Sequence, residues 1–418
     1  MKLFQRLLVA STAMSLIAPV AAQASDTLNL EEMNLYTRNS SSSKKQKISS
    51  KTFANELATV SDSVKNVEAQ NYDFEAGGFS ETTSLDGKVV FSIGALEQDD
   101  GNLNEATRTM YMWQGNLNTS FTGDDNLYVR LKTGNAAGWQ KAYTYGTYLS
   151  SAKGNSNEIK VDKIWYSFPV GDNNTVWIGP KIENYYMHAT TPSIYKPTTK
   201  QFTLGGNGSA YGASTNPGIG WAYKADNGFA ISSNVVSKEA DESTGFLTDE
   251  SATSWATQVG YTQPQYAASV MVNMKYNGWT DSYYTTPNGK LRPGDGNSTN
   301  IGLRGWWRPA ESGTATPEVS LGYDVSDTDD DTNSETTAWF AGLTWTNIFN
   351  PDDRIGAAFG QPQTREDEDV DPFAWETYYS FAVNDSVTNT VTIFGGSDRG
   401  GEDSGDHTGA VFETTFKF

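Results

Sequence analysis

Few residues of this sequence can carry out covalent chemistry. The chain has no cysteine, its histidines are His188 and His407, and no G-x-S-x-G segment is present. Because a catalytic nucleophile needs a base beside it, this composition argues against an enzyme. The lack of cysteine also excludes zinc-thiolate sites, iron–sulfur sites and disulfides. We therefore expect no catalytic residue, no metal site and no cofactor, and the arrangement of charged side chains is the chemistry left to explain.

The most unusual charge pattern lies in residues 184–217. This segment contains Lys196 and Lys200 but no Asp or Glu, although the whole chain has 50 acidic residues against 30 Lys and Arg. It could fold into a water-filled pore as a constriction loop that presents Tyr195, Lys196 and Lys200. The alternative is an ordinary surface loop whose lysines point into solvent. The absence of acids favours the constriction loop.

Further charged residues occupy the polar positions of alternating segments. For example, Arg130 and Lys132 alternate with Val129 and Leu131. Successive side chains of a strand point to opposite faces, so the charged set would share one interior. Opposed charges across a narrow aqueous passage set an ion preference, and we expect a mild preference for anions. The predicted inward set is Arg130, Lys132, Lys163, Lys181, Arg304, Arg308, Asp86, Glu183, Asp324, Glu376 and Glu413.

Sixteen segments show this alternation and are predicted to be strands. They cover residues 85–95, 109–121, 126–134, 159–168, 175–183, 218–224, 228–236, 254–261, 266–276, 298–308, 317–325, 336–346, 354–360, 374–383, 387–395 and 408–418.

The connections between the segments alternate between long and short, and every long one exceeds every short one. Short ones such as 122–125 and 225–228 carry Gly, Asp and Asn, the residues typical of tight turns. Ten-residue strands, an even strand count and this alternation are typical of an outer-membrane barrel. Lipid offers no hydrogen bonds, so a sheet satisfies its backbone there only by closing on itself. The predicted fold is all-β, a 16-stranded antiparallel transmembrane β-barrel over residues 83–418.

Three segments precede the predicted barrel. Residues 1–24 have a basic start, a short apolar run and a small-x-small site, as a signal peptide does. Residues 25–50 read as a flexible periplasmic segment. Residues 51–70 carry about two apolar heptads and predict a short helix. That helix could form a coiled coil that helps a homotrimer assemble, or it could be an amphipathic helix packed on its own chain.

The last strand carries a specific signal. From Val411 it alternates apolar with polar residues and ends on Phe418. In this respect the chain resembles outer-membrane proteins in general, whose terminal strand is bound by the outer-membrane assembly machinery.

Two N-terminal segments carry a narrower resemblance, Leu-Asn-Leu-Glu-Glu-Met-Asn at 28–34 and Phe-Ser-Glu-Thr-Thr-Ser-Leu-Asp-Gly at 79–87. Together with the last strand, they make the chain similar to cyanobacterial outer-membrane porins of the carbohydrate-selective (OprB-type) family. The resemblance implies a porin, with a third outer loop at 184–217 that narrows the pore. Family members commonly carry an S-layer-homology domain, for which this chain leaves no room before its heptads.

The charge distribution also suggests partners. The outer loops 237–253, 326–335, 361–373 and 396–407 are rich in Asp and Glu, and their only cations are Lys238, Arg365 and Arg399. These acidic runs read as solvated charge, and the alternative is divalent bridging to lipopolysaccharide. A net charge of −20 argues against nucleic acid. Outward aromatic residues at strand ends fit interfacial girdles in a lipid bilayer.

The predicted function is a channel in the outer membrane of a Gram-negative-type, cyanobacterial cell, for passive diffusion of small hydrophilic solutes and inorganic ions. One alternative is selectivity for carbohydrates, since aromatic residues predicted to face the lumen could contact sugars or pack on the constriction loop. Those residues are Trp165, Trp177, Trp306 and Tyr378. The other alternative, from a different class, is a secreted all-β binding or adhesion protein.

Overall fold

A computed structural model gives the fold of the chain. It describes residues 82–418 apart from 100–104, 144, 207–209, 213, 239–242, 244, 282–283, 290–295, 330–334 and 402–403. The predicted signal peptide 1–24, the segment 25–50 and the helix 51–70 lie outside the described residues.

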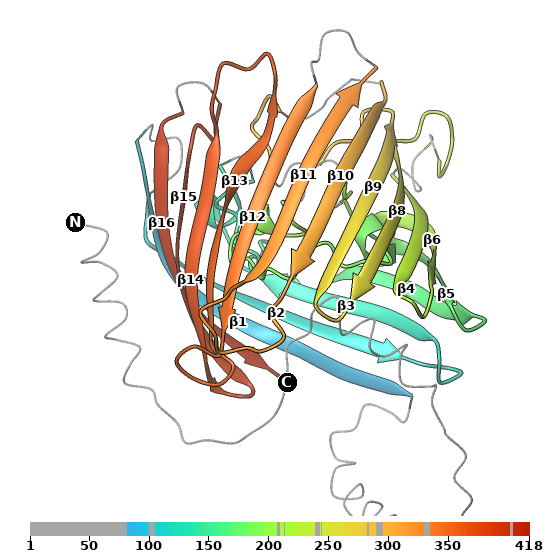
Figure 1. Cartoon of the computed structure of the whole chain (residues 1–418), viewed down its shortest axis with the longest axis horizontal. Coiled ribbons are helices and arrows are strands. Elements are labelled where there is room, and N and C mark those ends of the chain that lie inside the picture. Colours follow the sequence, from blue (N-terminus) through green and yellow to red (C-terminus); the bar gives the residue numbers. More distant parts are fainter. Residues whose placement is uncertain are drawn as a thin grey trace, which may run out of the picture.

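The described chain forms sixteen antiparallel strands that close into one barrel, with β1 paired to β16 (Figure 1). This confirms the predicted fold. No helix among the described residues is long and apolar enough to cross a membrane. The strands are β1 (Thr83–Gln98), β2 (Arg108–Thr119), β3 (Asn126–Gly134), β4 (Lys160–Val170), β5 (Asn174–Ile182), β6 (Asn216–Lys224), β7 (Phe229–Ser237), β8 (Thr253–Gln263), β9 (Tyr266–Tyr276), β10 (Ser298–Trp307), β11 (Glu318–Thr328), β12 (Thr336–Thr346), β13 (Arg354–Arg365), β14 (Phe373–Asn384), β15 (Val387–Ser397) and β16 (Asp406–Lys417).

The two faces of the barrel wall differ in polarity. Phe91 and Leu321 point outward and are 48% and 53% exposed, whereas their neighbours Ser92 and Ser320 point inward and are 3% and 1% exposed. Apolar side chains therefore cover the outer surface, as a lipid environment requires. The inner face is polar but it is covered, so loops must fill much of the lumen.

Connection length is one barrel feature that the sequence misjudged. The short-side connection 308–317 is longer than the long-side connection 329–335, so not every long connection exceeds every short one. The reason is that the β-ladder continues past the apolar band on the long-loop side. There β11 remains paired up to Thr328 and β13 remains paired up to Arg365.

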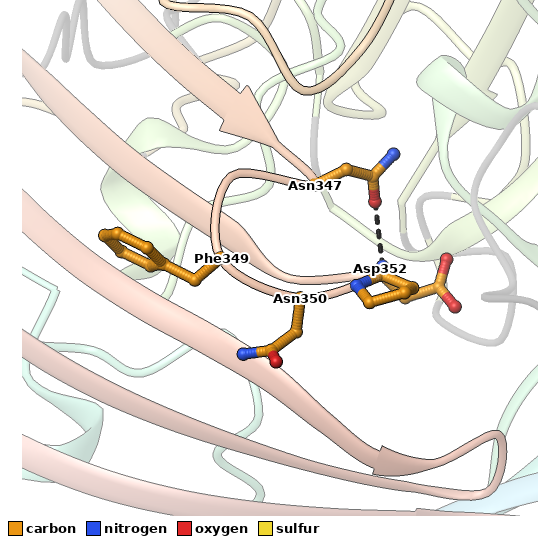
Figure 2. Close-up of a pocket in the computed structure, with 5 residues that line it drawn as sticks. Asn347, Phe349, Asn350 and Asp352 are labelled. Carbon is orange, nitrogen blue, oxygen red and sulfur yellow. Dashed lines mark hydrogen bonds between the residues drawn. The ribbon is translucent and has the colours of Figure 1, made fainter.

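The short turns are fixed by aspartate side chains. In the turn between β12 and β13, the Asp353 carboxylate accepts backbone N–H bonds from Ile348, Phe349 and Asn350 at 2.8, 2.9 and 3.0 Å. Figure 2 shows the same turn, with the Asp352 N–H donating to the Asn347 side chain. These bonds satisfy backbone groups that no neighbouring strand can reach.

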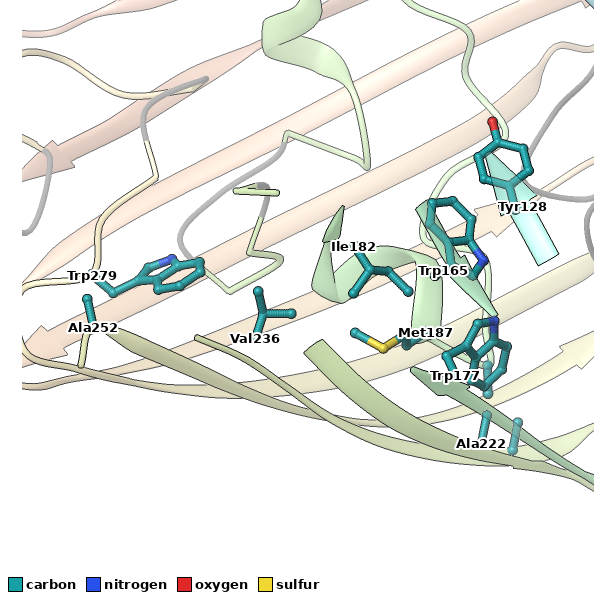
Figure 3. Packing of buried hydrophobic residues seen from close by; sticks show 11 residues of the cluster. Tyr128, Trp165, Trp177, Ile182, Met187, Ala222, Val236, Ala252 and Trp279 are labelled. Atoms are coloured by element: carbon teal, nitrogen blue, oxygen red, sulfur yellow. The ribbon is translucent and has the colours of Figure 1, made fainter. Parts of the chain in front are cut away.

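One end of the lumen is packed with apolar side chains. Trp165 on β4 and Trp177 on β5 pack with Tyr128, and Ile182 and Met187 extend this packing along the inner wall (Figure 3). Met187 belongs to the 3₁₀ helix η2 (Asn184–Met187), which begins the connection after β5. The connection between β5 and β6 therefore enters the barrel at this cluster.

Candidate functional site

The predicted constriction segment 184–217 corresponds to the connection between β5 and β6, and its described part lies inside the barrel along the inner faces of β7 and β8. The Asn184 amide donates to Asn234 at 2.8 Å, and the Thr190 N–H donates to the Gln258 side chain at 2.8 Å. Gln258 in turn donates to the Thr190 carbonyl at 3.0 Å. Inward polar side chains of the strands thus supply the hydrogen bonds that the loop backbone does not form with a neighbouring strand.

Glu376 on β14 holds the far part of this loop. Its carboxylate accepts the Tyr195 hydroxyl at 2.9 Å and the N–H groups of Thr198 and Thr199 at 3.1 and 2.8 Å. The Thr199 hydroxyl adds a fourth bond at 2.5 Å. Burial and the adjacent carboxylate raise the pKa of Tyr195 well above its usual value, so its hydroxyl stays a donor. The loop therefore crosses the lumen from β5 to β14.

A buried ion pair fixes the middle of the loop. The Nη2 group of Arg304 on β10 donates two hydrogen bonds to the carboxylate of Asp324 on β11, at 3.0 and 2.9 Å. Its Nε donates to the Leu204 carbonyl at 2.9 Å. Arg304 and Asp324 are 3% and 2% exposed, so neither charge faces free solution. Both predicted charges lie in the lumen, where they hold the loop in place.

A second connection, 135–159, also folds inward. Its Trp139, in the 3₁₀ helix η1 (Gly138–Lys141), is fully buried against Leu96, Phe394 and Val411. Its Ser151 hydroxyl bonds to Glu413 on β16. The two inward loops pair at a β-bridge between Leu149 and Thr199.

Arg399 joins the long loops above this bridge. Its guanidinium donates to the Thr285 carbonyl at 3.0 Å and to the Gln201 side chain at 3.1 Å. It lies 6.0 Å from the centre of the Tyr284 ring. Arg399 is 1% exposed, and burial lowers its pKa to about 10. It connects three loops that are distant in sequence.

The inner wall formed by β1, β2 and β3 also carries charged side chains, and some of them have no counter-charge among the described residues. Strand register places Lys417, Lys88, Gln114 and Lys132 side by side on four adjacent strands. Lys88 and Lys132 are half-buried, and neither forms an ion pair among the described residues. We call Lys88, Lys132 and Lys417 the lysine row.

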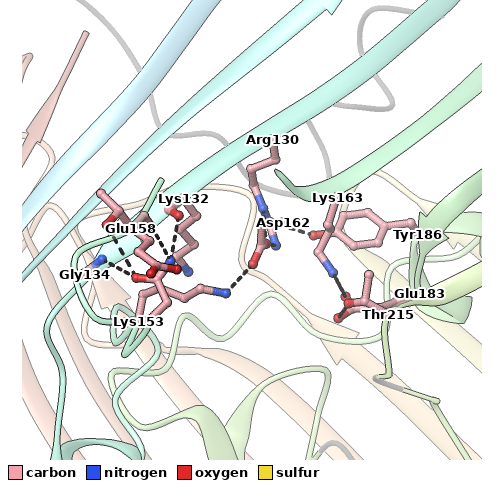
Figure 4. Close-up of polar contacts among 12 residues, drawn as sticks. Arg130, Lys132, Gly134, Lys153, Glu158, Asp162, Lys163, Glu183, Tyr186 and Thr215 are labelled. Carbon is pink, nitrogen blue, oxygen red and sulfur yellow. Dashed lines mark hydrogen bonds and ion pairs between the residues drawn. The ribbon is translucent and has the colours of Figure 1, made fainter. Parts of the chain in front are cut away.

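The next inward row toward the short turns is mixed in charge. It contains Asp86, Asn116, Arg130 and Lys163 on β1 to β4. Arg130 pairs with Asp162, which also accepts from Lys153 at 2.6 Å (Figure 4).

Lys163, at the end of this row, is 2% exposed and pairs with Glu183. Burial opposes ionisation of Glu183, but the Lys163 ammonium outweighs burial and lowers its pKa. The acids in and beside this row, Asp86, Asp162 and Glu183, are therefore already bound, whereas Lys88 and Lys132 form no ion pair in the part of the chain that the structure describes.

Comparison with known proteins agrees with this architecture. Residues 46–388 match the model of the carbohydrate-selective porin, OprB family. The chain belongs to this family. Proteins of this kind form water-filled barrels in the outer membrane.

Individual proteins that are similar to this chain in sequence or in structure have low sequence identity to it. An uncharacterized Nostoc protein is 30% identical over 44% of this chain, and an uncharacterized Synechocystis protein is 33% identical over 30% of it. The matches span 32% and 24% of those two proteins. Pseudomonas putida OprB has a TM-score of 0.55 at 11% identity, covering 81% of this porin and 94% of that chain. OmpT of Vibrio cholerae has a TM-score of 0.51 at 11% identity, covering 81% and 99%.

One predicted lumen residue of this porin lies on the other face of the wall, and another lies at the end of its strand. The pairing of β4 with β5 shifts between Ile164 and Tyr166, and the pairing of β5 with β6 shifts between Gly179 and Ile182. As a result Lys181 lies opposite Ile164, on the outward face of the barrel. Lys181 is accordingly exposed. Arg308 follows the last residue of β10, and its Nε donates to the Pro264 carbonyl in the neighbouring turn at 2.9 Å. Its guanidinium lies 5.2 Å from the centre of the Trp306 ring, so Arg308 stands at the short-turn end of the barrel beside an inward tryptophan.

The remaining predicted residues lie along the porin lumen. Lys196 and Lys200 are half-buried, and the Lys200 ammonium lies 4.9 Å from the centre of the Tyr148 ring. Lys132 interacts electrostatically with Arg130, Lys200 and Lys88. Lys200 of this connection and the lysines of β1 and β3 therefore face the same space.

His188 is buried, and burial lowers its pKa to about 3, so its ring is neutral at neutral pH. Among the described residues, no group of three or more His, Cys, Asp and Glu is arranged to hold a metal ion.

Sequence reasoning missed the second inward loop, 135–159, and the loop-joining role of Arg399. The only signal for the loop was Trp139, a large apolar residue in a polar connection. No signal in the sequence pointed to Arg399.

Proposed function

We propose that this chain forms a water-filled channel for passive diffusion of small hydrophilic solutes and inorganic ions, with a mild preference for anions at its constriction. The observation that supports the proposal is the lysine row, because Lys88 and Lys132 are half-buried on the inner wall and have no ion-pair partner among the described residues. Acids near them are engaged elsewhere, as Asp86 accepts from Asn116 and Asn118 at 2.6 and 2.9 Å.

The charges of the opposite wall are paired with one another. The lysine row is therefore the dominant source of electric field in the lumen. Arg304 with Asp324 and Lys275 with Asp281 are neutral as pairs and 7% exposed or less. A cleft lined by one sign of charge raises the local concentration of counter-ions. The acidic long loops at the mouth attract cations, so the net preference for anions is weak.

Reversal potential in a KCl gradient across a planar bilayer tests the proposal. We expect a potential of the sign that indicates chloride preference. The Lys88→Gln, Lys132→Gln double variant should move it toward potassium, whereas Lys181→Gln, which changes an outward lysine, should leave it unchanged. A clear cation preference of the unaltered channel contradicts the proposal.

Carbohydrate selectivity is a second candidate, favoured by one observation. The half-buried rings of Tyr185 and Tyr186 lie 4.4 Å apart in the constriction loop, and Tyr186 accepts a bond from Arg130 at 3.1 Å. Aromatic faces beside hydrogen-bonding groups suit sugar rings. If maltose-type sugars block the current and Tyr185→Ala abolishes the block, this candidate replaces general diffusion.

Assembly and location complete the proposal. We infer a homotrimer in a cyanobacterial outer membrane, exported after cleavage behind Ala24 and inserted by the assembly machinery through the last strand. Phe418 supports this role, since it exchanges backbone bonds with Gly87 on β1 at 2.8 and 3.1 Å and so completes the barrel closure. Deletion of Phe418 should reduce insertion without changing export, and N-terminal sequencing of the mature protein checks the cleavage site. We place the acidic loops on the cell surface, beside lipopolysaccharide.

A further inference from the structure

The side chains of the lysine row are spaced closely enough to act on a single solute. Lys88 and Lys132 are separated by one strand, and neighbouring strands lie about 4.8 Å apart, so their Cα atoms are about 10 Å apart. Two lysine side chains on the same face can span that gap from both sides. Between them Gln114 presents an amide, which already donates to Asn116 at 3.1 Å.

Several cationic side chains interact electrostatically with Lys88 and Lys132. Lys132 is repelled by Arg130, Lys200 and Lys88, and Lys88 is repelled by Arg130 and Lys417. The acids that oppose them, Asp162 and Glu413, are held by other partners. Like charges that converge in a partly desolvated space are stabilised when an anion joins them.

We propose that the lysine row is a transient binding site for polyvalent oxyanions of the phosphate class inside the channel. Lysine is a compact point charge that binds phosphate oxygens, and several lysines together favour an anion of higher charge over chloride. The row faces the lumen, so free oxyanions reach it whereas lipid headgroups do not. This inference rests on the proposed function, since it assumes an open channel.

Block of the chloride current by inorganic phosphate tests the site. The full-length protein is inserted into a planar bilayer in KCl at pH 7.5, and potassium phosphate is added at constant ionic strength. We expect phosphate and sulfate to reduce the single-channel current or make it flicker, whereas nitrate should not. In the Lys88→Gln, Lys132→Gln variant the half-blocking concentration should rise about tenfold, a change of about 1.4 kcal/mol in binding free energy.

Two further variants keep the result interpretable. Lys181→Gln removes an outward lysine and should keep the phosphate block, and Lys88→Arg, Lys132→Arg keeps the charge and should restore most of it. A chloride current that phosphate does not affect, or equal block in the double glutamine variant, overturns the oxyanion site while the channel proposal stands. A correctly inserted barrel without any current overturns the proposed function itself.

Discussion

The charged side chains on the two walls of the lumen differ in burial and in ion pairing. On the wall from β7 to β14, which we call the covered wall, the constriction loop lies on the strands, and Arg304, Asp324 and Glu376 are at most 3% exposed and fully bonded. On the wall from β1 to β3, which we call the open wall, Lys88 and Lys132 are half-buried and form no ion pair within the described ranges. We infer that charged groups on the covered wall stabilise the fold, whereas those on the open wall are available to interact with solutes.

The largest expected difference between the walls concerns stability. Arg304→Met leaves Asp324 buried without its counter-charge, which costs about 3–5 kcal/mol. Lys132→Met removes a charge that no partner balances, so it should change the free energy of unfolding by less than about 1 kcal/mol. Urea unfolding of the barrel in lipid vesicles, followed by tryptophan fluorescence, measures both. Equal losses from the two variants would contradict the distinction between the walls.

Loop 135–159 should depend on its tryptophan. Trp139→Ala creates a cavity against Leu96, Phe394 and Val411 and should cost about 3–4 kcal/mol. We also expect faster proteolysis within 135–159. Trp307→Ala, which changes an outward residue that is 43% exposed, is the control and should leave the proteolysis rate unchanged.

Glu376 should control the width of the pore more than the stability of the barrel. Glu376→Ala leaves the N–H groups of Thr198 and Thr199 and two hydroxyls without their acceptor, at about 1–3 kcal/mol for the set. The far part of the constriction loop should then move, and single-channel current should become larger and noisier. Glu158→Ala alters an exposed acid and serves as the control. An unchanged current would show that the loop needs no carboxylate.

The smallest effect concerns a charge outside both walls. Burial opposes ionisation of Asp353, but backbone N–H groups of the turn outweigh it and lower its pKa below the usual 3.8. Its stabilisation is therefore complete above about pH 4 and is lost as pH falls through the folded-state pKa. Asp353→Asn should cost about 1 kcal/mol at pH 7 and flatten the acid limb of the stability profile. Unfolding measured between pH 2 and 7 checks both.

The sequence was sufficient for the barrel because period-2 alternation is a local property. The predicted strands 126–134, 266–276 and 336–346 coincide with β3, β9 and β12. Lys181 was misplaced because one register shift moves all following side chains to the other face, and a β-bulge leaves no mark in the alternation.

The site was harder to predict because its contacts join distant segments. Glu376 was expected in the lumen, but no local pattern indicates that its partners are Tyr195, Thr198 and Thr199. The same is true of the Leu149–Thr199 bridge between the two inward loops. Which charges remain available to solutes depends on these pairings, and only the folded chain displays them.

The most direct test compares reversal potentials of three channels in the same KCl gradient. They are the unaltered protein, the open-wall variant Lys88→Gln, Lys132→Gln, and the covered-wall variant Lys275→Gln, Asp281→Asn, which removes a neutral pair joined at 2.6 Å. We predict chloride preference for the first and third channels and a shift toward potassium for the second. An equal shift in both variants, or none in either, would contradict the claim that the open wall sets selectivity.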